Sequence, residues 1–405
     1  MRAIWLVLLA LAVIVPQAAG SWLGTAWTHR RLVTIEPDSV GTGISSYGDI
    51  DSGLQSPTII GIPILIDTLP SAVYDSAAVD GSDIRFTALN GHSIYPHELV
   101  YYNAAAESCQ IWVRFGSLTP SFAKAWLYYG NSGATMPTPA EQQATFSEMS
   151  LAYHFENTPA LGRLVDSSPN GWDALAEAAG AQVWDADDRV DGAVQRGWHY
   201  NQNVTTTING PVIPDLDWSL FAWMEMDTFG TDFLLHGKGA RGGGGTCYMH
   251  VATGASDASH APQYANDSCS SIGNGIDYRF PEDGTEDDFH HYAFYFTSAD
   301  SMVTLYKDGI ETPVDTFTPT GGRMVPHGLN SAVEKLGVGS TQYTQDGTGS
   351  LTDSMHGTVD ELWIRTGKFS YYGQPTSNFF KTVYRNQSAP TTFLAVGSEE
   401  DCACE

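Results

Sequence analysis

Short segments in which apolar and polar residues alternate run through most of this chain, and one of the clearest spans residues 356–365 (HGTVDELWIR). Its positions form two sets, with Val359, Glu361, Trp363 and Arg365 on one face and Thr358, Asp360, Leu362 and Ile364 on the other. A period of two residues is that of a β-strand, in which successive side chains point to opposite faces. We expect this segment to be the closing strand of a β-sandwich.

Further short strands, separated by turns rich in Gly, Pro and Asp, are predicted on both sides of a polar stretch near residue 140. Before it they cover 27–35, 59–66, 83–87, 99–102, 110–115 and 123–129. After it they cover 151–156, 195–200, 220–226, 233–236, 247–252, 290–296, 302–306 and 335–338. Residues 377–385 carry a helical pattern with Ser377 as possible cap. This spacing of strands predicts an all-β protein.

The chain of 405 residues suits two domains better than a single core. The small, polar and proline-bearing composition between the two groups of strands marks a linker. We therefore divide the chain into a signal peptide at 1–20, a β-sandwich domain at 22–131, a linker at 132–147, a second sandwich domain at 148–398 and an acidic, Cys-containing tail at 399–405.

The signal peptide is predicted from a short charged start, an apolar run over 3–16 and small residues at 18–20. The apolar run is shorter than the roughly 20 residues that a spanning helix needs. We expect a secreted, periplasmic or cell-surface protein. In the alternative, this segment stays uncleaved as an anchor, and it would then be the one contact with a membrane.

The net charge of the chain limits the classes of partner that it can bind. Lys and Arg total 19 against 46 Asp and Glu, which gives a net charge of −27 at pH 7. Such a charge repels phosphate backbones and anionic lipids, so nucleic-acid binding is disfavoured. Divalent cations and neutral ligands remain compatible with it.

Five cysteines in an exported chain suggest disulfides with one thiol left over. Cys247 and Cys269 flank a segment of turn residues, and we expect them to be bonded. Cys109 begins a predicted strand and is interpreted as a small buried apolar residue. The pairing of Cys402 and Cys404 in the tail stays open.

Two sets of motifs resemble known families. The segments DGSDIRFTALNGHSIYPHEL, CQIWVRF and AWLYYGN in the first domain resemble the bacterial family named domain of unknown function 2341. That family occurs on exported proteins, often ahead of a laminin-G-like domain, and its name carries no activity. In the second domain, FHHYAFYF, LYKDG and GTVDELWI resemble the laminin-G-like jelly roll of the concanavalin A-like lectin/glucanase superfamily. The resemblance implies a jelly roll that binds glycans or surface proteins.

The glucanase branch of that superfamily catalyses with two glutamates in a Glu-x-Asp-x-x-Glu strand. The nearest piece here begins at Glu225, and Gly230 stands where the second Glu is needed. His290 and His291 occupy adjacent strand positions, so they point to opposite faces and suit one metal ion poorly. The sequence thus offers no catalytic residue.

A calcium site is implied by the resemblance, because such jelly rolls often bind one structural calcium between an early acid and the acid of the V-D-E-L strand. The matching positions are Glu156, Asp166, Asn170 and Asp360. Calcium prefers oxygen ligands of these kinds. We expect one structural calcium ion.

Aromatic residues in or near loops suggest where a glycan binds, since ring faces stack on sugars. Trp172, Trp184 and Trp198 are the candidates. The predicted function is an exported, non-catalytic binding or adhesion protein whose partner is a glycan or a cell-surface protein. One alternative is a glycoside hydrolase or lyase with an unrecognised carboxylate pair. Another is a structural envelope protein associated with a proton-channel biopolymer transport system.

Overall fold

The structure is a computed structural model. It describes residues 22–36, 61–116, 118, 124–155, 163–176, 182–184, 198–200, 206–209, 217–226, 232–240, 246–253, 262–267, 276–279, 289–297, 302–312, 335–338, 357–366 and 377–401. The chain is nearly all β, as predicted, and its sheets are antiparallel. None of the described helices is long and apolar enough to cross a bilayer. The predicted signal peptide lies outside the described residues.

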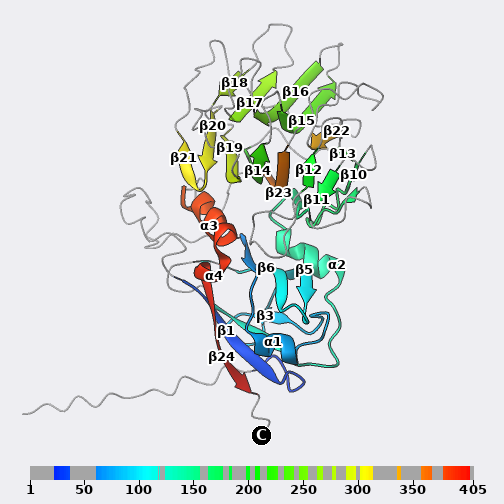
Figure 1. Cartoon of the computed structure of the whole chain (residues 1–405), viewed down its shortest axis with the longest axis vertical. Helices are drawn as coiled ribbons and strands as arrows, with labels where there is room; N and C mark the ends of the chain where they lie inside the picture. Colours follow the sequence, from blue (N-terminus) through cyan, green and yellow to red (C-terminus); the bar gives the residue numbers. More distant parts are fainter. Residues whose placement is uncertain are drawn as a thin grey trace, which may run out of the picture.

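The first half contains a five-stranded and a three-stranded sheet (Figure 1). The five-stranded sheet has the order β24 (Leu394–Asp401), β1 (His29–Ile35), β7 (Lys124–Tyr129), β3 (Arg85–Thr87) and β4 (Ile94–Tyr95). The three-stranded sheet has the order β2 (Pro63–Ile66), β6 (Ser108–Arg114) and β5 (His97–Asn103), and α1 (Ser71–Ser76) follows β2. All six strands predicted in this half are present.

The second half contains two eight-stranded sheets. One has the order β18 (Ile276–Arg279), β17 (Pro262–Asp267), β16 (Thr246–Thr253), β15 (Asp232–Ala240), β22 (Lys335–Val338), β13 (Thr206–Asn209), β10 (Ala174–Ala176) and β9 (Arg163–Leu164). The other has the order β11 (Gln182–Trp184), β12 (Trp198–Tyr200), β23 (Gly357–Thr366), β14 (Trp218–Met226), β19 (His290–Thr297), β20 (Met302–Lys307) and β21 (Ile310–Thr312), and β8 (Leu151–Tyr153) also pairs with β23. β23 is the segment whose alternation predicted a strand.

The predicted linker is an ordered connection. It contains α2 (Pro139–Gln143) and the 3-10 turn η3 (Ala144–Phe146). Thr138 caps α2 through a capping box with Glu141, which satisfies free N–H groups at the start of the helix. Gln142 then donates to the Pro137 carbonyl and accepts from the Leu99 backbone N–H, so this connection is fixed to β5.

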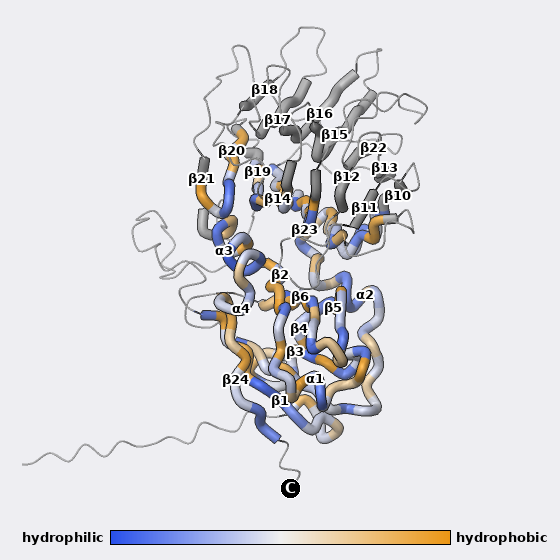
Figure 2. The backbone as a smooth tube through the Cα atoms, viewed as in Figure 1, coloured by the Kyte–Doolittle hydropathy of each residue, from blue (hydrophilic) through white to orange (hydrophobic). Residues whose placement is uncertain are grey.

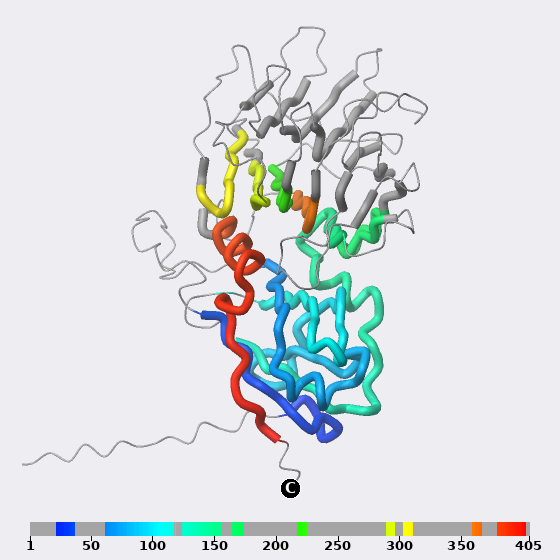
Figure 3. Tube along the Cα trace, viewed as in Figure 1, coloured from blue at the N-terminus to red at the C-terminus, as the bar shows by residue number. Residues whose placement is uncertain are grey.

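The end of the chain returns to the first half. The predicted helix is present as α3 (Ser377–Ser388), and the short α4 (Pro390–Phe393) leads into β24. β24 pairs antiparallel with β1, so residues 394–401 belong to the first sheet. Placing residues up to 398 in the second sandwich and the rest in a tail was therefore wrong for this strand (Figure 3).

One apolar core runs across both halves. The buried cluster that includes Ile64 and Val113 from the first half also includes Phe221 and Trp363 from the second. The strand β6 explains how this is possible, because both of its faces are buried. Figure 2 shows apolar β2 lying toward α3 and the second half, whereas β24 changes from apolar to hydrophilic along its length. The described parts of the two halves thus share one interior.

Candidate functional site: a buried polar cluster between the halves

Glu361 stands at an irregularity in β23. Phe221 of β14 is opposite Trp363, but Trp223 is opposite Asp360, so an extra residue is inserted in β23 between these two pairs. Glu361 has a φ of 49°, in the left-handed region that a non-glycine residue seldom adopts. Such a β-bulge redirects a side chain. The carboxylate of Glu361 is fully buried at the boundary between the halves.

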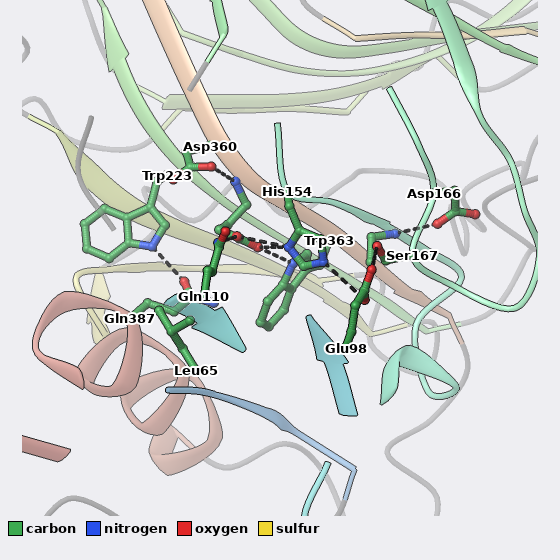
Figure 4. Close-up of polar contacts among 12 residues, drawn as sticks. Leu65, Glu98, Gln110, His154, Asp166, Ser167, Trp223, Asp360, Trp363 and Gln387 are labelled. Carbon is green, nitrogen blue, oxygen red and sulfur yellow. Dashed lines mark hydrogen bonds and ion pairs between the residues drawn. The ribbon is translucent and has the colours of Figure 1, made fainter. Parts of the chain in front are cut away.

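Three side chains donate hydrogen bonds to this carboxylate (Figure 4). His154 Nδ1 lies 2.8 Å from Oε2, Trp363 Nε1 lies 2.9 Å from Oε2, and Gln110 Nε2 lies 3.1 Å from Oε1. Trp363 comes from the same strand, His154 follows β8, and Gln110 comes from β6 of the first half. The buried charge is therefore matched by donors from both halves.

His154 lies between two carboxylates. Its Nε2 is 3.6 Å from Glu98 Oε2, and Ser167 Oγ donates to the other oxygen of Glu98 at 2.7 Å. Burial alone would lower the pKa of His154, but the carboxylates of Glu361 and Glu98 outweigh it and raise the pKa to about 10. The ring also stacks on Trp112, with centroids 5.6 Å apart. His154 is thus held as an imidazolium.

The arrangement limits what this cluster can do chemically. The side chains of His154 and Glu361 are 5% and 0% exposed, so a substrate atom has no access to them. The imidazolium of His154 lies between Glu98 of β5 and Glu361 of β23, and it therefore links one strand of the first half to one strand of the second. We interpret the cluster as a buried ionic joint between the halves and not as a catalytic centre.

The end of α3 makes a second joint. The side-chain amide of Asn386 accepts from the Leu65 backbone N–H at 2.7 Å and donates to the Leu65 carbonyl at 3.0 Å. It therefore replaces a neighbouring strand at the edge of β2. The next residue, Gln387, accepts from Trp223 Nε1 of β14 at 2.7 Å (Figure 4). Adjacent residues of one helix thus bind one half each.

A third joint is formed by Glu148, which follows η3. Its Oε1 lies 2.8 Å from Arg114 of β6, and its Oε2 lies 3.6 Å from Arg365 of β23. Glu148 thus bridges a cation of the first half and one of the second. Together the three joints, which lie on different elements, oppose independent movement of the halves.

Asp166, a predicted calcium ligand, has another role. Its Oδ1 accepts from the backbone N–H groups of Ala152 and Ser168, and its Oδ2 accepts from Ser168 Oγ and the Trp172 N–H. Burial raises the pKa of Asp166 against these hydrogen bonds, which lower it. A carboxylate whose two oxygens already accept four hydrogen bonds does not fit a calcium ligand in this geometry.

Asp360, another predicted calcium ligand, does not lie beside Asp166. Asp360 is buried and accepts from the Glu361 N–H, and Figure 4 shows it on the opposite side of the polar cluster from Asp166. Asn170 donates to the Ser150 carbonyl. Glu156 lies outside the described residues. Calcium binding stays a prediction without a described site that fits it.

Two of the three predicted sugar-binding tryptophans are neighbours. Trp184 of β11 is the register partner of Trp198 of β12, at the edge of their sheet. Trp172 is partly buried, and its backbone N–H donates to Asp166. The sequence could not predict that Trp184 and Trp198 are cross-strand partners, because the two positions are 14 residues apart and the strands β11 and β12 are short.

Of the five cysteines, the structure describes Cys109 and Cys247. Cys109 is buried, as predicted, with Sγ 3.7 Å from the Ile66 carbonyl. Cys247 lies on β16, whose neighbour β17 ends at Asp267 opposite Tyr248. Cys269 lies outside the described residues, as do Cys402 and Cys404. The disulfide between Cys247 and Cys269 therefore stays a prediction.

His290 and His291 have separate environments, as their adjacent positions predicted. His290 Nδ1 lies 2.7 Å from Asp308 Oδ2. The ring of His291 is buried, and burial lowers its pKa to about 4. Neither side chain belongs to a cluster of possible metal ligands among the residues that the structure describes.

Sequence reasoning missed the residues of the ionic joint. Gln110 and Trp112 alternate with the apolar set of β6, which is typical of a solvent-facing side, yet both are buried against the second half. Glu361 was recognised as a charged residue of its strand but not as buried. A polar residue inside an otherwise apolar strand was the available signal.

Comparisons with solved structures give distant likenesses. Domain 4 of AbnA, a GH43 extracellular arabinanase from Geobacillus stearothermophilus in complex with arabinotriose, is similar at 16% identity over 58% of this chain and 98% of that chain, with a TM-score of 0.42. Trypanosoma rangeli sialidase in complex with sialic acid is similar at 12% identity over 75% of this chain and 46% of that chain, with a TM-score of 0.38. This chain thus spans less than half of the sialidase.

The Ruminococcus gnavus IT-sialidase CBM40 bound to alpha2,3 sialyllactose is similar at 9% identity over 42% of this chain and 83% of that chain, with a TM-score of 0.31. No curated protein matches the chain. A family model does match, and its range runs past the predicted linker to include Glu98, Gln110, His154 and Ser167 of the ionic joint. Residues 80–172 match the family described as domain of unknown function (DUF2341).

Proposed function

We propose that this protein is an exported, non-catalytic binding protein in which the second sandwich binds a glycan and the first sandwich holds it in a fixed orientation. The observation that carries this proposal is that the acidic residues of β23 at the boundary between the halves are buried and hydrogen-bonded. Glu361 and Asp360 are buried, and their carboxylates accept internal hydrogen bonds. These two acidic residues therefore stabilise the fold.

A glycosidase needs the opposite arrangement. Its two carboxyl groups flank a cleft, roughly 5 Å apart in a retaining enzyme and 6.5 to 9.5 Å apart in an inverting one. Glu98 and Glu361 do flank a side chain, but that side chain is His154, which is buried and paired with both. The space that a sugar would need is filled by protein.

The glycan side of the proposal rests on the edge of the sheet at β11 and β12. Trp184 and Trp198 are cross-strand partners there, and paired aromatic residues offer apolar faces to sugar rings. The net charge of −27 favours neutral or cationic ligands over anionic ones. We also propose that the second half is a laminin-G-like domain and that the protein is located at the cell surface or outside the cell.

The test is a glycan array followed by titration of the best neutral oligosaccharide. We expect binding by the intact protein, a loss of at least about tenfold in affinity for Trp184→Ala with Trp198→Ala, and no release of reducing ends from a polysaccharide panel. The matched control is Val79→Ala, which changes a side chain 79% exposed on the first half.

Three results would count against the proposal. Sustained release of reducing ends, lost when one Glu or Asp is replaced, would make the protein a hydrolase. Binding of a cell-surface protein with no binding of any glycan would assign the surface to a different partner. Equal affinity in the double variant and in the control would remove the edge at β11 and β12 from the site.

A further inference from the structure

We infer that the two ends of the described chain form a binding site for a divalent transition metal, with His29 of β1 and Glu399 and Asp401 of β24 as ligands. Among the described residues, this is the group of three whose possible ligand atoms lie within 4.8 Å of one another. These strands belong to the five-stranded sheet, whereas Trp184 and Trp198 lie on β11 and β12 of a different sheet (Figure 1), so the site is independent of the proposed glycan site.

The strand pairing brings these three side chains to one face. β1 and β24 are antiparallel, and His29 is the register partner of Asp401. Glu399 lies two residues before Asp401 on the same strand, so both acids point to the same side of the sheet. Cross-strand partners and residues two apart are the nearest neighbours on a sheet face. The site therefore follows from the register, which the sequence alone did not predict.

The distances suit a small cation. His29 Nδ1 lies 3.1 Å from Asp401 Oδ1 and 3.5 Å from Glu399 Oε1. A neutral imidazole carries one N–H, so Nδ1 donates to one of these two oxygens or, as the other tautomer, to neither. A metal ion between the three atoms satisfies the imidazole lone pair and both carboxylates together.

Neighbouring side chains fix two of the ligands. The ring of His29 stacks on Tyr129, with centroids 5.3 Å apart and an angle of 22° between the planes. The second oxygen of Glu399, Oε2, accepts from the Tyr129 hydroxyl and from Arg31, whose Nη2 is 3.2 Å away. Hydrogen bonds of this kind orient metal ligands and hold them ready. Oε1 of Glu399 is left facing His29.

The donor set indicates the class of metal. One imidazole nitrogen with two carboxylate oxygens is a set that Zn²⁺ and similar borderline cations take, whereas Ca²⁺ and Mg²⁺ prefer oxygen alone. Three ligands leave a fourth position for water, and Asp401 is 80% exposed, so the ion exchanges with solvent. Because the ligands come from both ends, bound metal would fasten β24 to β1.

The experiment is a calorimetric titration of the full chain with ZnCl₂ after dialysis against EDTA, together with its melting temperature. The variant Glu399→Gln keeps the size of the side chain and removes one ligand charge. Its matched control is Glu400→Gln, which removes the same charge from the next residue, where the carboxylate pairs with Arg30 on the other face. We expect Glu399→Gln to lose the tightest Zn²⁺ site and Glu400→Gln to keep it.

A second variant keeps the test sound if Glu399→Gln unfolds because Arg31 loses its partner. Asp401→Asn changes an exposed side chain, and we expect a loss of Zn²⁺ affinity of about tenfold or more with an unchanged melting temperature in EDTA. The inference is overturned if the wild type binds no Zn²⁺, in which case the three side chains form an ion pair only. Equal Zn²⁺ affinity in the wild type, Asp401→Asn and Glu400→Gln would overturn it as well.

Discussion

His154 and Glu361 of the second half form an ion pair at the boundary with the first half, with Nδ1 and Oε2 2.8 Å apart and both side chains buried. Burying two charges costs free energy that their attraction repays only when the remaining polar atoms are also satisfied. Trp363 and Gln110 supply hydrogen bonds to the carboxylate, and Glu98 lies on the other side of the imidazole. The pair is therefore part of a network whose loss should be felt by both halves.

Removing the imidazole leaves the buried Glu361 and the partly buried Glu98 without their shared cation. We expect His154→Ala to lower the free energy of unfolding by about 3 to 5 kcal/mol, as for other broken buried ion pairs. Urea unfolding followed by tryptophan fluorescence measures this. The control His92→Ala replaces an exposed histidine and should change stability little. A loss no larger than that of the control would show that the network contributes nothing to stability.

The same histidine predicts a loss of stability on the alkaline side. The pKa of His154 is raised to about 10 in the folded protein, against about 6.5 in an unfolded chain. Between these values the folded state binds a proton that the unfolded state does not, so stability is fully present below pH 6.5 and is lost as the pH rises through 10. Unfolding free energies measured from pH 6.5 to 10 should fall in the wild type and fall less in His154→Gln. Parallel curves would contradict the assignment.

For His291 we expect the opposite dependence on pH, a loss of stability in acid. Burial lowers its pKa to about 4, and its ring nitrogens have no hydrogen-bond partner among the described residues. The unfolded state therefore takes up a proton below pH 6.5 that the folded state refuses, and stability is lost as the pH falls toward 4. His291→Phe should reduce this loss, since Phe221 and Trp223 already surround the ring. An unchanged acid limb in the variant would argue against it.

We expect that replacing Asn386 destabilises the edge of β2 locally. Asn386→Ala leaves the buried Leu65 N–H and carbonyl without partners, which costs about 1 to 3 kcal/mol. Ser388→Ala changes an exposed residue of the same helix and serves as the control. Amide hydrogen exchange should show faster exchange at Leu65 in the first variant only. Equal protection of Leu65 in both variants would mean that the helix does not hold the edge of β2.

The shared core predicts that the halves unfold together. Residues of both halves belong to one buried cluster, and three polar joints connect them. Scanning calorimetry should therefore give a single transition, whose calorimetric and van't Hoff enthalpies agree. Shortening the chain before residue 394 removes β24 from β1 and should lower that transition as a whole. Two separate transitions in the intact protein would show that the halves are independent domains.

The all-β class and most strand positions could be predicted from the amino-acid sequence alone. Strands such as β1 and β23 alternate at a period of two, and that period indicates a strand whatever lies around it. The buried Cys109 and the separate environments of His290 and His291 followed in the same way, because strand geometry fixes which face a residue occupies. Local geometry was sufficient for these features.

The burial of particular polar residues and the pairing of distant strands became apparent only in the folded chain. β24 ends in Glu399, Glu400 and Asp401, a composition typical of a solvated tail, yet these residues lie opposite the basic end of β1. Gln110 and Glu361, 251 residues apart, likewise meet only because the two halves share an interface. A polar side chain is buried where a partner compensates its lost hydration, and that partner is chosen by long-range packing that no local pattern records.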